Sequence, residues 1–251
     1  MQTRTRTGLF SSPRSIGLVL AALCGFTAGL TGGCATERAT PERGASVKPG
    51  INKDFLDPAL DVERYVERFE TESREIYSER AAVLERIALK PGQAVADIGA
   101  GTGLYTYLFA DAVGPTGKVY AVDIAAPFVE RIQTTAAERG LAQVVGVQCT
   151  EDDVRLPPQS IDVAFVCDTY HHFEYPAATL ASLHRALRPG GTLIVIDFHR
   201  IEGVTREWTL NHVRAGQEVF SAEIQAAGFT LEAVDTPPGL KENYLLRFRR
   251  R

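Results

Sequence analysis

Several features that would place the 251-residue chain in a specialised class are missing from its sequence. It has no internal period of self-similarity, which excludes a repeat array. Basic residues number 27 and acidic residues 31, so the net charge of −4 gives no reason to expect a nucleic-acid partner. Met1 is the only methionine, so a shorter product would need a start other than AUG. With 45% hydrophobic and 23% charged residues, the composition is typical of a soluble globular domain.

The first 33 residues contain no acidic side chain and no apolar run long enough to span a membrane comfortably. A basic start precedes "IGLVLAALCGFTAGL", which has the length of a signal-peptide core. The small residues of "TGGCAT" lead to Cys34, and this order resembles a bacterial lipoprotein signal. The resemblance implies removal of residues 1–33 and lipidation of Cys34, which would anchor the protein to a membrane of the cell envelope. A plain secretory signal with a periplasmic product, or an uncleaved anchor, stays open because Thr31 stands where an aliphatic residue is usual.

The remainder divides by composition into a tether and a folded domain. Residues 34–50 are polar, rich in Pro, Gly, Ser and Thr, and have no apolar face to bury, which predicts a flexible tether. Residues 51–251 are expected to form the domain. Within it, residues 58–89 carry apolar side chains three and four positions apart, which predicts a helical extension broken near residues 71–73.

From residue 90 onward, short apolar runs alternate with helical patterns. The alternation predicts an α/β fold, with a doubly wound, Rossmann-like and mostly parallel sheet of seven strands and helices on both faces. The last strand is expected to be antiparallel, as it is in the family that the motifs below resemble. The expected strands are residues 93–98, 118–124, 142–149, 160–168, 192–198, 229–236 and 243–249.

Two cysteines, Cys149 and Cys167, fall near the ends of the third and fourth expected strands. In the strand order of that family, two other strands separate these two. At about 4.8 Å for each strand step, the two cysteines would lie roughly 14 Å apart, which is beyond disulfide reach. We therefore expect both to be free thiols in the core.

A glycine-rich turn follows the first expected strand in "VADIGAGTGLY". Gly99, Gly101 and Gly103 alternate there, and a residue without a Cβ lets a ligand approach the main chain closely. A turn of this kind between a strand and a helix is where doubly wound folds bind nucleotide-like ligands. A dinucleotide fingerprint would need a glycine at position 104, and Leu104 stands there, which argues against an NAD(P)-dependent oxidoreductase.

With Asp97 two positions ahead of it, the turn resembles the first motif of class I S-adenosylmethionine-dependent methyltransferases. The resemblance implies that the turn packs on the methionyl part of the cofactor and that Asp97 lies near its ammonium group. Asp123, at the end of the second strand, has the position of an acid that accepts hydrogen bonds from ribose hydroxyls. In "TEDDVRLPPQ", Asp152 is the best match to a residue that contacts adenine and Asp153 the next, with a helix N-cap as the alternative. The full implied set is Asp97, Gly99, Ala100, Gly101, Thr102, Gly103, Asp123, Ile124, Asp152 and Asp153.

The segment "CDTYHHFEYP" follows the fourth strand, at the sheet edge where open α/β folds bind ligands. It resembles the corresponding segment of small-molecule methyltransferases of the ubiquinone/menaquinone type. A base is needed only if the methyl acceptor must lose a proton, and a histidine suits neutral pH. No metal site is expected, because no cysteine or third histidine is close in sequence. The candidates for catalysis are Asp168, Tyr170, His171 and His172.

The motifs together imply an enzyme that transfers a methyl group from S-adenosylmethionine to an unidentified, small-molecule acceptor. The sequence leaves the oligomeric state undetermined. A non-catalytic lipoprotein that keeps the cofactor fold is the main alternative, since S-adenosylmethionine is made in the cytoplasm and the signal indicates export. A misassigned start codon would place the protein in the cytoplasm and remove this conflict.

Replacing Cys34 with serine tests the lipoprotein interpretation. Serine has no thiol to accept the lipid, so we expect Cys34→Ser to move the protein from the membrane fraction to the soluble fraction. Fractionation with mass spectrometry of the native N-terminus measures both. A variant that stays with the membrane would indicate an uncleaved anchor instead.

Overall fold

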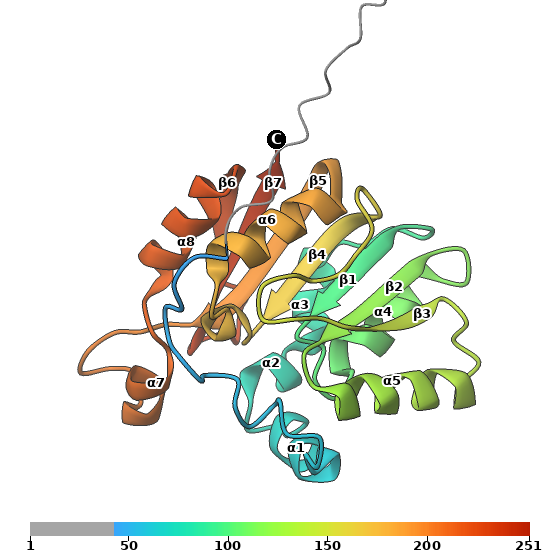
Figure 1. Cartoon of the computed structure of the whole chain (residues 1–251), viewed down its shortest axis with the longest axis horizontal. Helices are drawn as coiled ribbons and strands as arrows, with labels where there is room; N and C mark the ends of the chain where they lie inside the picture. The colour runs from blue at the N-terminus through green and yellow to red at the C-terminus, as the bar shows by residue number, and fades with distance from the viewer. Residues whose placement is uncertain (1–42) are drawn as a thin grey trace, which may run out of the picture. The chain divides into compact units, whose positions relative to one another are not determined.

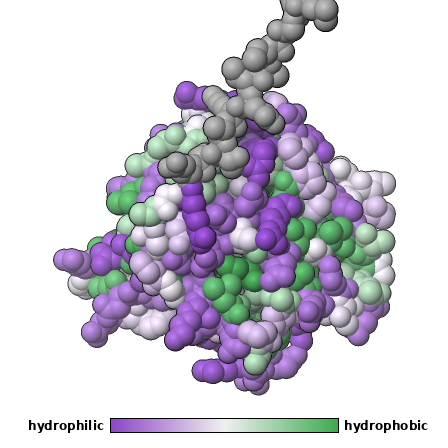
Figure 2. Space-filling view, in the orientation of Figure 1, coloured by the Kyte–Doolittle hydropathy of each residue, from purple (hydrophilic) through white to green (hydrophobic). Residues whose placement is uncertain are grey.

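The computed structural model describes residues 43–251. The signal and the lipidation site at Cys34 lie outside the described residues. Within the part that is described, no helix is long and apolar enough to cross a membrane. The face shown in Figure 2 is largely hydrophilic, with apolar residues in small groups between the charged ones.

A seven-stranded sheet forms the centre of the domain, in the order β3-β2-β1-β4-β5-β7-β6 (Figure 1). The strands from β3 to β5 pair in parallel, whereas β7 is antiparallel to both of its neighbours, β5 and β6. The predicted fold class is confirmed, including the antiparallel last strand. The strands are β1 (Ala94–Ile98), β2 (Lys118–Asp123), β3 (Val144–Gln148), β4 (Ile161–Cys167), β5 (Leu187–Phe198), β6 (Phe229–Asp235) and β7 (Asn243–Arg250).

Helices cover the two faces of the sheet because alternate strand residues point to opposite sides. On one face Val95 and Phe165 pack with residues of α3 and α4, while on the other Ala96 and Ala164 pack with residues of α6 and α8. The helices are α1 (Val62–Phe69), α2 (Glu75–Ser78), α3 (Arg80–Ile87), α4 (Leu104–Val113), α5 (Ala126–Glu138), α6 (Pro176–Ala186), α7 (Glu207–His212) and α8 (Gln217–Ala226). A short 3-10 helix, η1, spans Tyr170–His172.

The predicted helical extension is three helices, α1 to α3. Asp61 caps the first, accepting a hydrogen bond from the backbone N–H of Arg64 at 3.3 Å. The helical conformation is interrupted between Phe69 and Glu75, where Thr71 and Ser73 hydrogen-bond to each other and do not continue the helix. The two helices nearest the break, α1 and α2, lie beyond the carboxyl ends of the parallel strands (Figure 1).

The predicted tether ends earlier than its composition indicates. Val47 donates its backbone N–H to the carbonyl of Glu174 at 3.0 Å, and the Ser46 hydroxyl bonds to the Glu174 carboxylate at 2.7 Å. Lys48 bonds to the carbonyl of Asn211 at 3.1 Å. Residues 46–48 therefore belong to the domain surface. Hydrophobic patterning gives no sign of these residues, because polar hydrogen bonds and not buried apolar side chains attach them to the domain.

Cys149 follows β3 and Cys167 ends β4, with β2 and β1 between the two strands. Both cysteines are free. The prediction that they do not form a disulfide is confirmed.

Candidate active site

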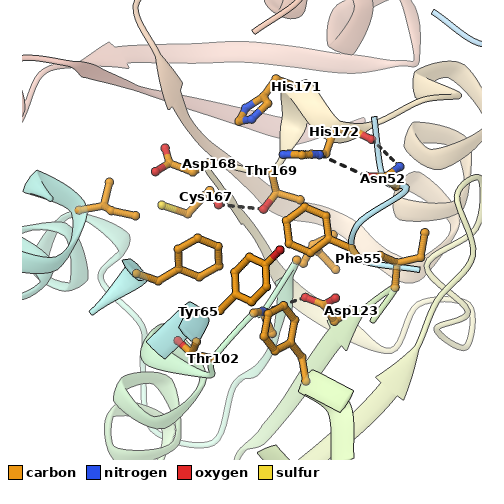
Figure 3. A pocket seen from close by; sticks show the side chains of 18 of the residues that line it. Asn52, Phe55, Tyr65, Thr102, Asp123, Cys167, Asp168, Thr169, His171 and His172 are labelled. Atoms are coloured by element: carbon orange, nitrogen blue, oxygen red, sulfur yellow. Dashed lines mark hydrogen bonds between the residues drawn. The ribbon is translucent and has the colours of Figure 1, made fainter. Parts of the chain in front are cut away.

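A cavity of about 790 Å³ lies at the carboxyl ends of the parallel strands. Residues after β1, β2 and β4 line one side of it, and residues of the N-terminal segment line the other (Figure 3). An aromatic wall made of Phe55, Tyr65, Phe69 and Phe128 encloses it, with Tyr65 about 5.5 Å from Phe55 and 5.3 Å from Phe69 between ring centres. The side that faces the sheet was predicted from sequence, whereas the aromatic wall was not.

The glycine turn after β1 lines the cavity with Gly99 and Gly101 but not with Gly103. A Cβ on Gly99 would come within 2.3 Å of the Thr169 side chain, so Gly99 lets the loops after β1 and β4 pack together. A Cβ on Gly103 would meet Tyr107 at 2.9 Å. A Cβ on Gly101 would be in ordinary van der Waals contact with the Phe69 ring, at 3.7 Å. The main chain at Gly101 is partly exposed in the cavity wall, and Phe69 faces it.

Asp97 is a buried acid at the cavity wall, only 4% exposed. The Thr106 hydroxyl donates to one of its oxygens at 2.7 Å. Burial, together with the nearby charge of Asp123 and against the hydrogen bonds from Thr106, raises the pKa of Asp97 to about 7. A carboxyl with this pKa becomes fully ionised when a cation is placed beside it.

Asp123 ties the end of β2 to the glycine turn. It accepts hydrogen bonds at 2.8 Å from the backbone N–H of Gly101 with one oxygen and from that of Ala125 with the other. Burial raises the pKa of Asp123 to about 6 despite these bonds. Its carboxylate lines the cavity next to Ile124, as predicted.

Asp152 and Asp153, the two aspartates that the sequence singled out for an adenine contact, are bonded to other side chains. The Asp152 side chain accepts from Thr150 at 2.8 Å, and Asp153 pairs with Arg185 at 2.8 Å. Neither aspartate lines the cavity, whereas Glu151 does. The doubled aspartates follow the glutamate directly, so a register error of one residue accounts for the difference.

Of the four catalytic candidates, Tyr170 does not reach the cavity. Its ring is fully buried, and its hydroxyl donates to Glu223 at 3.0 Å. Asp168 lines the cavity, but it is paired with Arg74 and accepts from the amide of Asn243 at 2.6 Å. Burial raises the pKa of Asp168 to about 6, although Arg74 lowers it. Tyr170 is thus a core residue, and Asp168 joins α2 to β4 and β7.

The two adjacent histidines line the cavity and have different partners. His171 is 2% exposed, and its Nδ1 donates to the buried carboxylate of Asp197 at 2.8 Å. His172 lies with its Nδ1 at 3.2 Å from the amide oxygen of Asn52. Burial lowers the pKa of His172 well below its ordinary value, with a further contribution from His171.

A third histidine, His212 at the end of α7, joins this pair in space although it is not close in sequence. Its Nε2 lies 3.3 Å from the Nε2 of His172. Burial lowers the pKa of His212 to about 4. Forty residues separate the two in sequence, and no local pattern marks His212, so only the fold brings it to the site.

Comparisons with known proteins agree with this arrangement. A family model described as a methyltransferase domain matches residues 96–195. Ubiquinone/menaquinone biosynthesis C-methyltransferases from Burkholderia cenocepacia and Bordetella parapertussis are 30% and 31% identical over 122 residues, which is 49% of this chain and 50% and 47% of theirs. The chain thus spans about half the length of these curated relatives. A crystal structure of an S-adenosylmethionine-dependent methyltransferase from Aquifex aeolicus superimposes with a TM-score of 0.67 and 25% identity, covering 76% of this chain and 99% of that one.

The burial of Asp97 predicts a pH-dependent effect on stability. Its pKa is 3.8 when exposed and about 7 when folded, so the folded state resists ionisation of this group. The contribution of Asp97 to the free energy of unfolding therefore falls as pH rises from about 4 to about 7, and stays constant above that. We expect Asp97→Asn to be more stable than the wild type by roughly 2–4 kcal/mol at pH 8 and by much less at pH 4.

Urea unfolding of the full chain at both pH values measures this difference. The matched control is Asp111→Asn, at an exposed position on α4, which should show no such change with pH. An Asp97→Asn variant that is less stable than the wild type at pH 8 would contradict the unfavourable burial of this charge.

Proposed function

We propose that this chain, whose residues 96–195 form a class I methyltransferase domain, transfers a methyl group to a small-molecule acceptor. The cofactor that the family and the fold imply is S-adenosylmethionine. The observation that carries the proposal is one cavity that joins the open turn at Gly101, two buried acids and a group of histidines.

The residues present fit this cofactor. The main chain at Gly101 lines the cavity and carries no side chain that would block the approach of a methionyl group, and the Phe69 ring is the nearest group to the place a Cβ would take. Asp97 has the position and the raised pKa to pair with the cationic amino group. Asp123 has lone pairs left over from its two backbone bonds, and these can accept from ribose hydroxyls. Ala100, Thr102 and Ile124 complete the wall around it.

S-adenosylmethionine supplies an electrophilic methyl group, so the protein needs chiefly to align the acceptor with it and to exclude water. The aromatic wall of Phe55, Tyr65, Phe69 and Phe128 removes water from the acceptor side. His171 and His172 direct nitrogen atoms into the same cavity and are the residues that we propose for holding the acceptor and receiving its proton. Asp197 fixes the ring of His171 by accepting from its Nδ1.

The size of the cavity and the relatives support a small acceptor. A volume of about 790 Å³ lies in the range of roughly 300–1,000 Å³ that small-ligand sites occupy. The curated relatives are named for ubiquinone and menaquinone biosynthesis, but they match this chain over half its length only. The residues that shape the acceptor side, such as Phe55 and His212, lie outside the matched methyltransferase domain.

Attachment to the cell envelope is a separate proposal that rests on the first 34 residues alone. The basic start, the apolar run and the small residues before Cys34 support it. The assignment of the cofactor site rests on residues 43–251 and so does not depend on this proposal.

Cofactor binding is the first test. We expect the full chain to bind S-adenosylmethionine and its demethylated product in calorimetric titration, and not NAD. Gly101→Val should abolish this binding because the branched side chain fills the open space beside the turn. Asp123→Ala should weaken it by roughly 1–3 kcal/mol through lost hydrogen bonds.

Gly140→Val is the matched control, since Gly140 also has a positive φ of 67° but faces open space away from the cavity. Its backbone strain should lower stability without changing cofactor affinity. Binding of NAD with no binding of S-adenosylmethionine would overturn the proposed function.

A second test separates the acceptor side from the cofactor side. We expect His172→Ala to lower the rate of methyl transfer by about 100-fold or more, the usual effect of losing a positioned proton acceptor, while cofactor affinity stays within about twofold. Initial rates with labelled cofactor, corrected for the folded fraction from thermal unfolding, give the comparison. A near-normal rate per folded molecule would make His172 a structural residue.

A further inference from the structure

Three of the five histidines of the chain converge on one wall of the cavity. His171 and His172 come from η1 after β4, and His212 comes from the end of α7. One ring nitrogen from each lies within 4.8 Å of the other two. Figure 3 shows His171 and His172 side by side, with Asn52 bonded to the second.

We infer that His171, His172 and His212 bind a divalent transition metal ion, Zn²⁺ by the chemistry of the ligands. Three histidines with a free fourth position are a ligand set that Zn²⁺ takes in catalytic sites. With Zn–N distances of about 2.0–2.1 Å, tetrahedral geometry separates two ligand nitrogens by about 3.3 Å. The nitrogens of His172 and His212 already have this separation, 3.3 Å. All three nitrogens lie within 4.8 Å of one another, so the cluster has to contract somewhat when an ion is bound.

The hydrogen bonds behind two of the rings orient their lone pairs toward the cluster. The amide nitrogen of Asn52 donates to the carbonyl of His172 at 3.1 Å, which leaves the Asn52 oxygen to accept from the His172 Nδ1. Asp197 in the same way accepts from the Nδ1 of His171. In both rings the proton lies on Nδ1, so Nε2 carries the lone pair. Histidines that bind metals typically donate their other N–H to such a carboxylate or carbonyl oxygen.

The charges around the cluster allow a cation. Asp197 is fully buried and supplies a negative charge directly behind His171. Two nearby positive groups, Lys48 and Arg68, disfavour a cation, and each contacts neutral partners. Lys48 bonds to the carbonyls of Asn211 and His212, and Arg68 lies over the Trp208 ring. Trp208 itself stacks on His212 with ring centres 4.7 Å apart, which fixes the ring from its far side.

The alternative to a metal ion between these rings is a single proton, shared by the Nε2 atoms of His172 and His212. That arrangement uses two of the three rings and leaves the lone pair of His171 without a role. The Asp197 carboxylate holds the His171 ring in place, since it accepts from both the ring Nδ1 and the backbone N–H of His171. A metal ion uses all three. The proton and the metal predict different results for the variants below.

The fourth position of the metal opens into the cavity that the glycine turn lines, because all three histidines belong to that cavity wall. This part rests on the proposed function: an acceptor bound there is one that coordinates Zn²⁺ as an anion, a thiol or a hydroxyl compound. A metal bound there would lower the pKa of the acceptor's S–H or O–H group, and the proton would leave to solvent, so the histidines would then act as ligands and not as the proton acceptor. The resulting anion would form a bond to the methyl carbon as the bond between that carbon and the sulfonium sulfur breaks, and the demethylated cofactor would leave as a neutral thioether.

Metal binding is tested on the full chain after dialysis against a chelator. We expect one equivalent of Zn²⁺ in calorimetric titration, and visible absorption bands of a four-coordinate ion when Co²⁺ replaces it. His172→Gln and His212→Gln should each weaken binding by about 100-fold or more, since each removes a ligand. His184→Gln and His199→Gln, the two histidines away from the cavity, should leave affinity unchanged.

Asn52 provides a test of positioning that a purely structural role would not pass. Asn52→Ala removes the acceptor behind His172 and should weaken Zn²⁺ binding by about 10–100-fold, while Asn52→Asp keeps an acceptor oxygen and should restore it. Circular dichroism shows that each variant is folded. Zn²⁺ should raise the melting temperature of the wild type and of the His184 and His199 variants, and not that of the His172 and His212 variants.

Absence of binding to the wild type, or equal affinity in all four histidine variants, would overturn the metal site and favour the shared proton. The result is independent of the proposed function, because S-adenosylmethionine is titrated separately into the metal-free chain. Cofactor binding without metal binding defeats this inference alone. Metal binding without cofactor binding defeats the methyltransferase proposal and leaves the metal site standing.

Discussion

The site depends on one topological constraint, the reversal of strand order between β1 and β4. From β1 the chain continues to β2 and β3 on one side, and from β4 it continues to β5 on the other. The loops that follow β1 and β4 therefore leave in opposite directions and open a crevice at the carboxyl edge of the sheet. The two loops still meet at its base, where a Cβ on Gly99 would come within 2.3 Å of Thr169. Gly99 and Thr169 are both part of the cavity wall.

Ionisable groups in this crevice are held at a cost in stability. Asp97, Asp123 and Asp168 are buried, and burial raises the pKa of each, to about 7, 6 and 6. Their partners differ. Asp123 accepts from several backbone N–H groups, Asp168 pairs with Arg74, and Asp97 is bonded to Thr106 alone. Asp97, the acid with the least compensation, is the one that we propose to pair with a cationic ligand, so ligand binding and not the fold would complete its pairing.

The sheet side of the site could be predicted from sequence because its signals are local. Strand periodicity, the alternating glycines and an acid at a strand end each lie within a few residues, and the structure places Asp97, Gly101 and Asp123 at the cavity. Register within a loop is harder to read from sequence, because in the three adjacent acids Glu151, Asp152 and Asp153 only Glu151 lines the cavity. Tyr170 was wrong for a related reason. The 3-10 turn of η1 sends its ring into the core while the next two residues face the cavity.

The acceptor side could not be predicted, because contacts between distant segments build it. Asn52 reaches His172 over 120 residues, and His212 reaches it over 40. Neither pair has a signature in a single sequence. Polar residues such as Lys48 led to the prediction of a flexible tether, although Lys48 bonds to the domain. The cofactor half therefore follows from the sheet, which many proteins share, and the acceptor half follows from segments outside it. Segments outside the sheet can then alter the lining of the second half while the first stays the same, and the end of α7 illustrates this by placing His212 beside the two histidines of η1.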